Sequence, residues 1–399
     1  MKYVVVLGDG MADLPIESLG GKTPLEVANK PNIDTLAKVS EIGLVKTVAD
    51  GMKPGSDVAN LSVLGYDSAI YYSGRSPLEA VSIGVEFTPA DVTYRTNLVT
   101  LKGDKLEDCI MQDYSAGEIT TDEARELILA VEKELGTNGV HFFPGISYRH
   151  CLLLSDASTG ADLTPPHDIS GKAVREYLPK GEHGELLLSL MKRARQVLEN
   201  HPVNQNRIAR GLNPANSIWF WGEGRKPNLK NFEEKNGVKG AMISAVDLLK
   251  GIAMVSGMEV IEVEGATGNN DTNYKGKALA CLDALKRNDF VYIHIEAADE
   301  CGHRGELQNK IGSIEDIDKY VVGTLLDGLK GTEFSMMILP DHPTPIALKT
   351  HTNKPVPYLI YRSTKESKGA DVYSEAQAEE SGLFIENGYT LIDRFLKNS

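Results

Sequence analysis

Met336-Met337-Ile338-Leu339-Pro340-Asp341-His342 is an apolar run of strand length that ends on a carboxylate and an imidazole, and this stretch decides the fold. A short, continuous apolar run is typical of a buried parallel strand. In open α/β sheets ligands bind at the carboxyl ends of the strands, so Asp341 and His342 are expected at the rim of a crevice. His351 follows in a loop rich in Thr and Pro. For the pair alone, a turn aspartate and a solvated histidine remain an equally good interpretation.

Two further strands end in the same way. Phe290–Glu296 is followed by Asp299 and His303, and the apolar run Val4–Leu7 is followed by a glycine, Asp9 and a second glycine. Carboxylate and imidazole together suit zinc, manganese or iron better than calcium. Three strands that end in potential ligands predict a metal centre.

The length and composition are those of a soluble enzyme with two domains. The chain has 399 residues, of which 41% are hydrophobic and 25% charged, and no apolar run reaches membrane-spanning length. A formal net charge of −14 argues against nucleic-acid and anionic-membrane partners. A small anionic substrate would therefore need local cations, either metals or converging arginines.

Cysteine usage and the N-terminus favour a cytoplasmic location. The four cysteines (Cys109, Cys151, Cys281 and Cys301) form no CxxC pair, so we expect reduced thiols. The apolar run Val4–Leu7 is far shorter than the core of a signal peptide. The sequence leaves open whether the chain forms a homo-oligomer.

The pattern of elements changes in the middle of the chain. Residues 1–75 alternate strands and helices, and alternation resumes at the strand Ile218–Trp221. The segment 76–215 instead combines strands of polar alternation with capped and amphipathic helices. We predict an α/β protein with a discontinuous core domain, residues 1–75 and 216–399, and a smaller inserted α+β domain, residues 76–215.

Individual elements follow from periodicity and capping signals. Besides those above, we expect strands at 42–48, 94–101, 105–111, 151–154, 258–263, 334–339 and 358–361, helices at 33–39, 121–135, 186–198, 244–255, 277–286, 308–329 and 391–396, and a surface loop at 363–380.

Ser56 follows a Pro-Gly turn and begins an expected helix. A lone serine at such a position most often caps the helix by accepting a backbone N–H. Alternatively, the helix amides and a nearby cation lower the pKa of its hydroxyl and make it a nucleophile that can carry a phosphoryl group. The residues alone leave both roles open.

Arginines of the inserted domain stand beside Asn, Tyr and His. Each one by itself is more often a solvated surface charge, but as a set they can clamp a carboxylate or phosphate through two parallel hydrogen bonds. The candidates are Arg95, Asn97, Arg149, His150 and Arg207.

Taken together, these motifs resemble the cofactor-independent phosphoglycerate mutases of the archaeal type, within the alkaline phosphatase superfamily. The resemblance spans essentially the whole chain and rests on Gly8-Asp9-Gly10, Pro54-Gly55-Ser56-Asp57-Val58-Ala59-Asn60-Leu61, Asp299-x-x-x-His303, Pro340-Asp341-His342 and His351-Thr352-Asn353-Lys354-Pro355. It implies an alkaline-phosphatase-like, doubly wound sheet with an inserted substrate-binding domain.

The same resemblance implies two divalent metal ions, manganese before zinc or magnesium. Asp299, His303 and His351 would hold one ion, and Asp9, Ser56, Asp341 and His342 would hold the other. Ser56 would take the phosphoryl group of 3-phosphoglycerate and return it to the other hydroxyl, which gives 2-phosphoglycerate.

One segment departs from the family pattern. The strand Trp219-Phe220-Trp221 ends in Gly222-Glu223-Gly224-Arg225, where an arginine-bearing segment is expected, so a clamp arginine is missing or shifted to Arg225. This version resembles a bacterial branch proposed to phosphorylate homoserine, in which Glu223 could hold the ammonium group. A homoserine phosphotransferase, a metal-dependent phosphatase and a non-catalytic metal scaffold are therefore the alternatives, although no GxxxxGK[ST] nucleotide loop is present.

Overall fold

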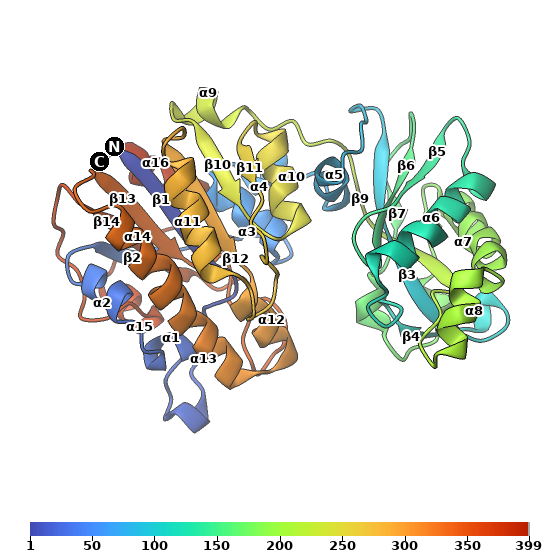
Figure 1. The fold of residues 1–399 in the computed structure, drawn as a ribbon, viewed down its shortest axis with the longest axis horizontal. Helices are drawn as coiled ribbons and strands as arrows, with labels where there is room; N and C mark the ends of the chain where they lie inside the picture. The colour runs from blue at the N-terminus through green and yellow to red at the C-terminus, as the bar shows by residue number, and fades with distance from the viewer. Residues whose placement is uncertain (398–399) are drawn as a thin grey trace. The chain divides into compact units, whose positions relative to one another are not determined.

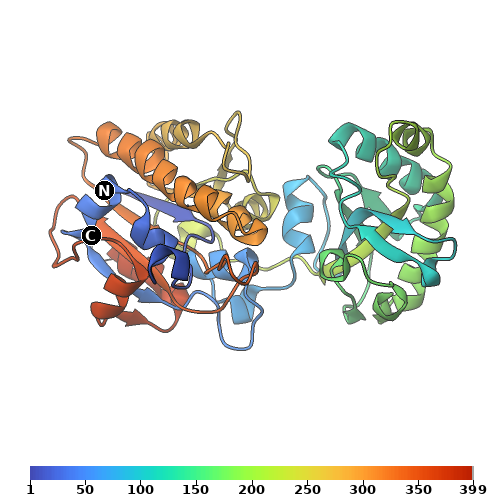
Figure 2. The same ribbon diagram turned by 90° about the horizontal axis from the view of Figure 1, so that it is seen from below.

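The structure is a computed structural model that describes residues 1–397, shown from two directions in Figures 1 and 2. The chain divides into two compact units. Unit 1 comprises residues 1–72 and the chain from Asn228 onward, and unit 2 comprises Ser73–Pro227. Each unit has its own sheet and its own hydrophobic core.

Unit 1 is built on an eight-stranded sheet in the order β11-β10-β12-β1-β13-β14-β2-β15. All six residues of β12 and of β13 are buried, as expected for strands covered on both faces. Only β14 runs antiparallel to its neighbours. The strands are β1 (Lys2–Gly8), β2 (Glu41–Val45), β10 (Gly240–Ile243), β11 (Glu259–Ile261), β12 (Phe290–Ile295), β13 (Phe334–Leu339), β14 (Val356–Arg362) and β15 (Phe384–Ile385).

The helices of unit 1 bury their apolar sides against this sheet. Figure 1 shows α11, α13 and α14 lying across one face, and their apolar side chains share a core with alternate residues of the central strands. The helices are α1 (Pro24–Val27), α2 (Pro31–Ala37), α3 (Ser56–Val63), α4 (Ser68–Tyr71), α9 (Phe232–Asn236), α10 (Asp247–Val255), α11 (Tyr274–Ala284), α12 (Ala297–Arg304), α13 (Leu307–Asp316), α14 (Gly323–Gly328), α15 (Glu375–Glu380) and α16 (Leu391–Lys397).

Unit 2 is organised around one long strand, β3 (Val92–Lys102), which pairs antiparallel with β4, β6 and β9. The helices α6 and α7 contribute to the core on which this sheet packs. The other elements are β4 (Ile110–Asp113), β5 (Val140–Phe143), β6 (Arg149–Leu154), β7 (Ala161–Asp162), β8 (Lys180–Gly181), β9 (Ser217–Gly224), α5 (Ser76–Ser82), α6 (Thr121–Leu135), α7 (Gly184–Glu199) and α8 (Pro202–Ala209).

The position of β9 corrects the predicted domain boundary at residue 216. We expected the strand Ile218–Trp221 to return the chain to the core domain, whereas it pairs with β3 and unit 2 continues to Pro227. Its side chains Ile218, Trp219 and Phe220 are buried in the second core. The apolar pattern of a strand shows that it is buried but not in which sheet, so this boundary was placed too early.

Three smaller expectations also change. The segment expected as a strand at 105–111 forms a 3-10 turn, Leu106–Asp108, before β4 begins at Ile110. The loop expected at 363–380 contains α15, whose Ser374 side chain accepts the N–H of Gln377 as an N-cap. The helix expected at 308–329 consists of α13 and α14 joined by a π-helical turn, Ile317–Val322.

Candidate active site

The candidate site lies at the carboxyl ends of three neighbouring parallel strands. β1 is paired with β12 on one side and β13 on the other, both parallel. The segments that follow these strands carry Asp9, Asp299 and the pair Asp341 and His342. Strand order therefore brings together the ligand candidates that are far apart in the sequence.

The turn after β1 lies very close to the segments that carry Asp299 and Thr344. Gly10 has a φ of +63°, and a Cβ atom there would lie 2.6 Å from the Cα of Asp299 and 2.7 Å from Oγ1 of Thr344. Only glycine adopts this left-handed conformation without strain and also has no Cβ atom that would clash here. The backbone N–H of Gly10 also donates to Oδ1 of Asp341 at 3.2 Å.

Asp9 is fully buried and points at Ser56. Its Oδ2 lies 3.3 Å from Oγ of Ser56 and 2.9 Å from Nε2 of His294, whereas its Oδ1 is buried without a hydrogen-bond partner. Burial, followed by the negative charge of Asp341, raises the pKa of Asp9 well above its usual value. Such a carboxylate calls for a nearby cation.

Ser56 is the first residue of α3 and does not cap it. Gly55 is the N-cap residue, and no side chain caps the helix. Instead, the Ser56 hydroxyl lies 3.3 Å from Nε2 of His342 as well as 3.3 Å from Asp9. The structure thus contradicts the capping interpretation and leaves the hydroxyl directed at the ligand candidates.

Asp341 and His342 are both fully buried. The carboxylate of Asp341 accepts the backbone N–H of His342 at 2.8 Å and the side-chain amide of Asn60 at 2.8 Å. Nε2 of His342 lies 3.4 Å from Asp341 and 3.7 Å from Asp9. Burial lowers the pKa of His342, which favours the neutral imidazole that can bind a metal.

The second cluster consists of Asp299, His303 and His351. Nε2 of His303 lies 3.2 Å and Nε2 of His351 3.4 Å from the Asp299 carboxylate, and the two nitrogens are 2.8 Å apart. Burial opposes ionisation of Asp299, but hydrogen bonds from both histidines hold its pKa well below the usual value. Asp299 also completes a second potential ligand group with Asp9 and His342, so it stands between the two predicted ion sites.

The histidines have the orientation expected of metal ligands. Nδ1 of His303 lies 3.0 Å from the carbonyl oxygen of Lys349, and Nδ1 of His351 lies 3.4 Å from that of Pro54. With Nδ1–H held by a carbonyl, it is Nε2 that faces the Asp299 carboxylate, and loss of the Nε2 proton would free its lone pair for a metal ion. With the orphaned Oδ1 of Asp9, this donor set fits divalent cations.

In unit 2, four of the five predicted substrate-binding residues lie on two paired strands. Arg95 and Asn97 on β3 face Cys151 and Arg149 on β6 in the strand register. The side-chain Nε atoms of Arg95 and Arg149 and Nε2 of His150 are buried without a hydrogen-bond partner. Burial, followed by the charges of the two arginines, lowers the pKa of His150 to about 3, so its imidazole is neutral.

Glu79 on α5 partly balances this positive cluster. Its Oε1 accepts from Arg95 at 2.8 Å and from Arg75 at 2.7 Å. Burial alone would raise the pKa of Glu79, but the charges of Arg95 and Arg75 lower it. The Arg95 guanidinium also lies 4.6 Å from the ring centroid of Trp221, whose indole N–H donates to Asn97 at 2.9 Å.

Arg207 does not belong to this group. It is 2% exposed, and its guanidinium donates to a carboxylate oxygen of Glu123 and to the carbonyl oxygens of Ala116 and Asn213. These contacts tie α8 to α6 and to the adjoining loops. They give Arg207 a structural role and leave Nη1, Nη2 and Nε all engaged.

Residues 223 and 225 are likewise engaged within unit 2. Oε1 of Glu223 accepts the backbone N–H groups of Gly160 and Ala161, at 2.8 and 3.1 Å. Arg225 donates to the carbonyl oxygens of Pro89, Ala90 and Ala157. These contacts hold the end of β9 to neighbouring loops.

Several residues around the site were missed from the sequence. His294 contacts Asp9 and, through Nδ1, Oγ of Ser244 at 3.2 Å. Thr344 donates through Oγ1 to Asp299 and lies 3.3 Å from Nδ1 of His342. An imidazole inside the buried apolar strand β12 was the one available signal, because a buried polar group needs a partner.

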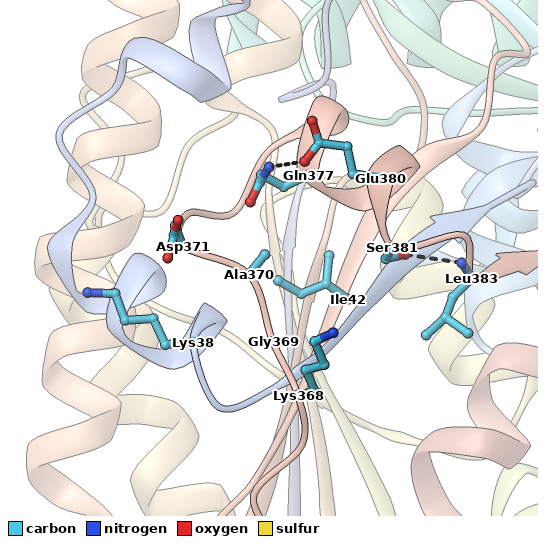
Figure 3. Close-up of a pocket in the computed structure, with 10 residues that line it drawn as sticks. All are labelled: Lys38, Ile42, Lys368, Gly369, Ala370, Asp371, Gln377, Glu380, Ser381 and Leu383. Atoms are coloured by element: carbon cyan, nitrogen blue, oxygen red, sulfur yellow. Dashed lines mark hydrogen bonds between the residues drawn. The ribbon is translucent and has the colours of Figure 1, made fainter.

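A cavity of about 440 Å³ lies elsewhere in unit 1, between α2, β2, α15 and the loop before α15 (Figure 3). Its lining mixes the basic Lys38 and Lys368 with the acidic Asp371 and Glu380. It includes none of the candidate site residues.

Two further findings concern the chain as a whole. All four cysteines are free and buried. Among the described residues, no helix is both long enough and apolar enough to cross a membrane.

Comparisons with known proteins agree with this arrangement. The family model of the 2,3-bisphosphoglycerate-independent phosphoglycerate mutases matches residues 37–204. A relative from Geobacter sulfurreducens, described as a probable enzyme of this name, is 50% identical over 99% of this chain and 100% of its own. The 2,3-bisphosphoglycerate-independent phosphoglycerate mutase of Methanosarcina barkeri is also 50% identical, with both chains covered completely.

Solved structures share the fold. A protein from Pyrococcus horikoshii, 30% identical, superposes with a TM-score of 0.83 over 99% of this chain and 96% of its own. The cofactor-independent phosphoglycerate mutase of Thermoplasma acidophilum, 26% identical, superposes with a TM-score of 0.67 over 100% of both chains. The predicted α/β fold class is confirmed by these likenesses and by the sheet of unit 1. From the identity and coverage of its relatives, the chain belongs to the 2,3-bisphosphoglycerate-independent phosphoglycerate mutase family.

Proposed function

We propose that this enzyme interconverts 3-phosphoglycerate and 2-phosphoglycerate by way of a phosphoserine at Ser56. The observation that carries the proposal is the position of the Ser56 hydroxyl, which begins α3 without capping it and lies 3.3 Å from both Asp9 and His342. A hydroxyl used only for folding would bond to the helix backbone. A nucleophile must instead face the groups that activate it.

Two divalent ions fit the donors around Ser56. Asp299, His303 and His351 would hold one ion, and Asp9, Ser56, Asp341 and His342 would hold the other, with manganese preferred over zinc or magnesium. When bound, such ions supply positive charge that favours the serine alkoxide and offsets the charge of phosphoryl oxygens. The support is that the carboxyl groups of Asp9, Asp299 and Asp341 are buried together beside His342, whose pKa is lowered by burial.

The chain's own groups account for the remaining steps. Ser56 loses its hydroxyl proton and its Oγ forms a bond to phosphorus as the bond from phosphorus to the substrate oxygen breaks; that oxygen keeps the electron pair and takes up a proton. The other hydroxyl of the glycerate then loses its proton and its oxygen bonds to the phosphorus of the phosphoserine; the bond from phosphorus to Ser56 Oγ breaks, and Oγ keeps the electron pair and takes up a proton. In both directions the enzyme has to hold the glycerate and exclude water.

We assign the binding of the substrate's negative groups to the arginine cluster of unit 2. Arg75, Arg95 and Arg149 surround a single carboxylate, Glu79, so the cluster carries excess positive charge. Buried N–H groups of Arg95, Arg149 and His150 that lack partners are suited to an anionic ligand. Arg207 is left out of this assignment because Glu123 and two carbonyls already engage it.

The homoserine alternative depends on Glu223. That alternative requires Glu223 to hold an ammonium group; its Oε1 already accepts two backbone N–H groups, whereas its Oε2 is buried without a hydrogen-bond partner. Oε1 thus has a structural task within unit 2, and the preference for phosphoglycerate over homoserine rests on the named relatives.

The test measures the wild-type enzyme and Ser56→Ala with manganese, using 3-phosphoglycerate alone or homoserine with ATP. We expect the wild type to form 2-phosphoglycerate and Ser56→Ala to lose the activity while it keeps most of its metal, because six other ligands remain. Acid-quenched wild-type enzyme should carry a phosphoryl group that Ser56→Ala lacks. Near wild-type turnover by Ser56→Ala, or activity with homoserine and ATP only, would refute the proposal.

A further inference from the structure

Lys310, on α13, is a fully buried lysine close to the candidate site. Its ammonium group donates to the carbonyl oxygen of Ala12 at 3.2 Å, to Oδ2 of Asp13 at 2.7 Å and to the carbonyl oxygen of Thr344 at 2.8 Å. An ammonium group has three N–H donors, so all of them are used. None of these acceptors is a candidate ligand.

The three acceptors belong to the two loops that carry candidate ligands. Ala12 and Asp13 follow β1 and Asp9, whereas Thr344 follows β13 and His342. The loops also meet directly, because the N–H of Thr344 donates to Ala12 at 3.3 Å and the N–H of Ile346 to Asp13 at 3.1 Å. Lys310 therefore joins the loop after β1 to the loop after β13.

Thr344 links this junction to the candidate ligands. Its Oγ1 donates to Asp299 and lies 3.3 Å from Nδ1 of His342. Its carbonyl oxygen, which Lys310 holds, lies against α12, where a Cβ atom on Gly302 would be 2.5 Å away. A shift of Thr344 would thus move contacts to both predicted ion sites.

A buried ion pair is costly to desolvate and is weak evidence of a role in stability. We propose that Lys310 is a positioning residue for the metal centre: with Asp13 it holds Thr344 where its hydroxyl orients Asp299 and His342. The inference rests on the proposed function, since it requires that these residues bind metal.

The chain offers a matched control in Lys30. This lysine is 1% exposed and lies 3.1 Å from Asp34, whose side chain is 24% exposed, so unit 1 holds a second buried ammonium group in an ion pair away from the candidate site. Lys310→Met and Lys30→Met each remove one buried ammonium group and keep the length of the side chain. For each purified variant, the dissociation constant of Mn²⁺ is measured by competition with a chelating dye, and Tm is measured with and without Mn²⁺.

We expect Lys310→Met to weaken Mn²⁺ binding by roughly 10–100-fold, as is usual when a group that orients metal ligands is lost. The rise in Tm on adding Mn²⁺ should shrink accordingly. Lys30→Met should lower Tm equally with and without Mn²⁺ and leave the affinity unchanged. A purely structural role for Lys310 would give the pattern of Lys30→Met.

Should Lys310→Met fail to fold, the double variant Lys310→Met with Asp13→Asn removes both charges of the pair and should show the same weakened Mn²⁺ binding. Wild-type affinity in whichever variant folds overturns the role of Lys310 and leaves the proposed function standing. A wild-type protein that binds no Mn²⁺, Zn²⁺ or Mg²⁺ overturns the metal centre itself, and the role of Lys310 with it.

Discussion

The turn at Gly10 offers a direct test of how tightly the site is built. In Gly10→Ala the new methyl group would lie 2.6 Å from the backbone Cα of Asp299, a contact that side-chain rotation cannot relieve. Gly20→Ala is the control. Gly20 has nearly the same backbone conformation, a φ of +68° against +63°, but nothing lies within 4 Å of its added Cβ atom.

The difference between the two variants follows from two energies. The left-handed conformation costs either alanine about 1–2 kcal/mol. At Gly10 the steric conflict adds about 1–3 kcal/mol, the usual cost of overpacking. We therefore expect a loss of roughly 2–5 kcal/mol for Gly10→Ala and about 1–2 kcal/mol for Gly20→Ala.

Thermal unfolding without metal measures these losses. At roughly 2 °C per kcal/mol for a domain of this size, Tm should fall by about 4–10 °C for Gly10→Ala and about 2–4 °C for Gly20→Ala. Because Gly10→Ala also displaces Asp299, its affinity for Mn²⁺ should fall about 10-fold or more, whereas Gly20→Ala should bind as the wild type does. Equal Tm values and equal affinities in the two variants would refute the reasoning.

Three further predictions concern single side chains. His303→Ala should retain about one of two Mn²⁺ equivalents after dialysis, and two full equivalents by elemental analysis would contradict the assignment. Glu79→Gln should cost about 3 kcal/mol in urea unfolding at pH 7, because it leaves buried Arg95 without its anion. The folded-state pKa of Glu79 is lowered, so its contribution is present above the unfolded pKa and is lost as the pH falls through the folded value. The two proteins should therefore converge in stability toward pH 4 and below; a difference independent of pH would argue against the ion pair. Arg149→Ala should raise KM for 3-phosphoglycerate roughly tenfold or more, from the loss of a charge-assisted hydrogen bond, whereas Arg207→Ala should lower stability by about 1–3 kcal/mol and leave KM unchanged. If Arg207→Ala raised KM and Arg149→Ala only lowered stability, Arg207 would be the substrate-binding residue and Arg149 the structural one.

The positions at which the central strands end could be predicted from the sequence, because buried parallel strands have a simple sequence pattern. A short apolar run followed by polar residues marks the carboxyl end of a buried strand, and neighbouring parallel strands present these ends on the same edge. That is why Asp9, Asp299, Asp341 and His342 could be placed together before their geometry was known.

Only the tertiary structure decided which strands pair and which side chains contact one another, because both depend on which surfaces meet. The aromatic strand β9 has the pattern of a core strand in either unit, and only its register with β3 places it in unit 2. In the same way, Arg149 and Arg207 look alike in the sequence. The carboxylate of Glu123 and two carbonyls engage Arg207, whereas Nε of Arg149 is buried without a partner.

The residues that position the candidate ligands could not be predicted from the sequence either, because their roles also depend on which surfaces meet. Contacts with residues distant in the chain give His294, Thr344 and Lys310 their roles. No local sequence pattern predicts such contacts. Local patterns report whether a segment is buried, how it begins and how it ends. The choice of partner for a buried polar group depends on distances that arise only when the strands, helices and loops have packed together.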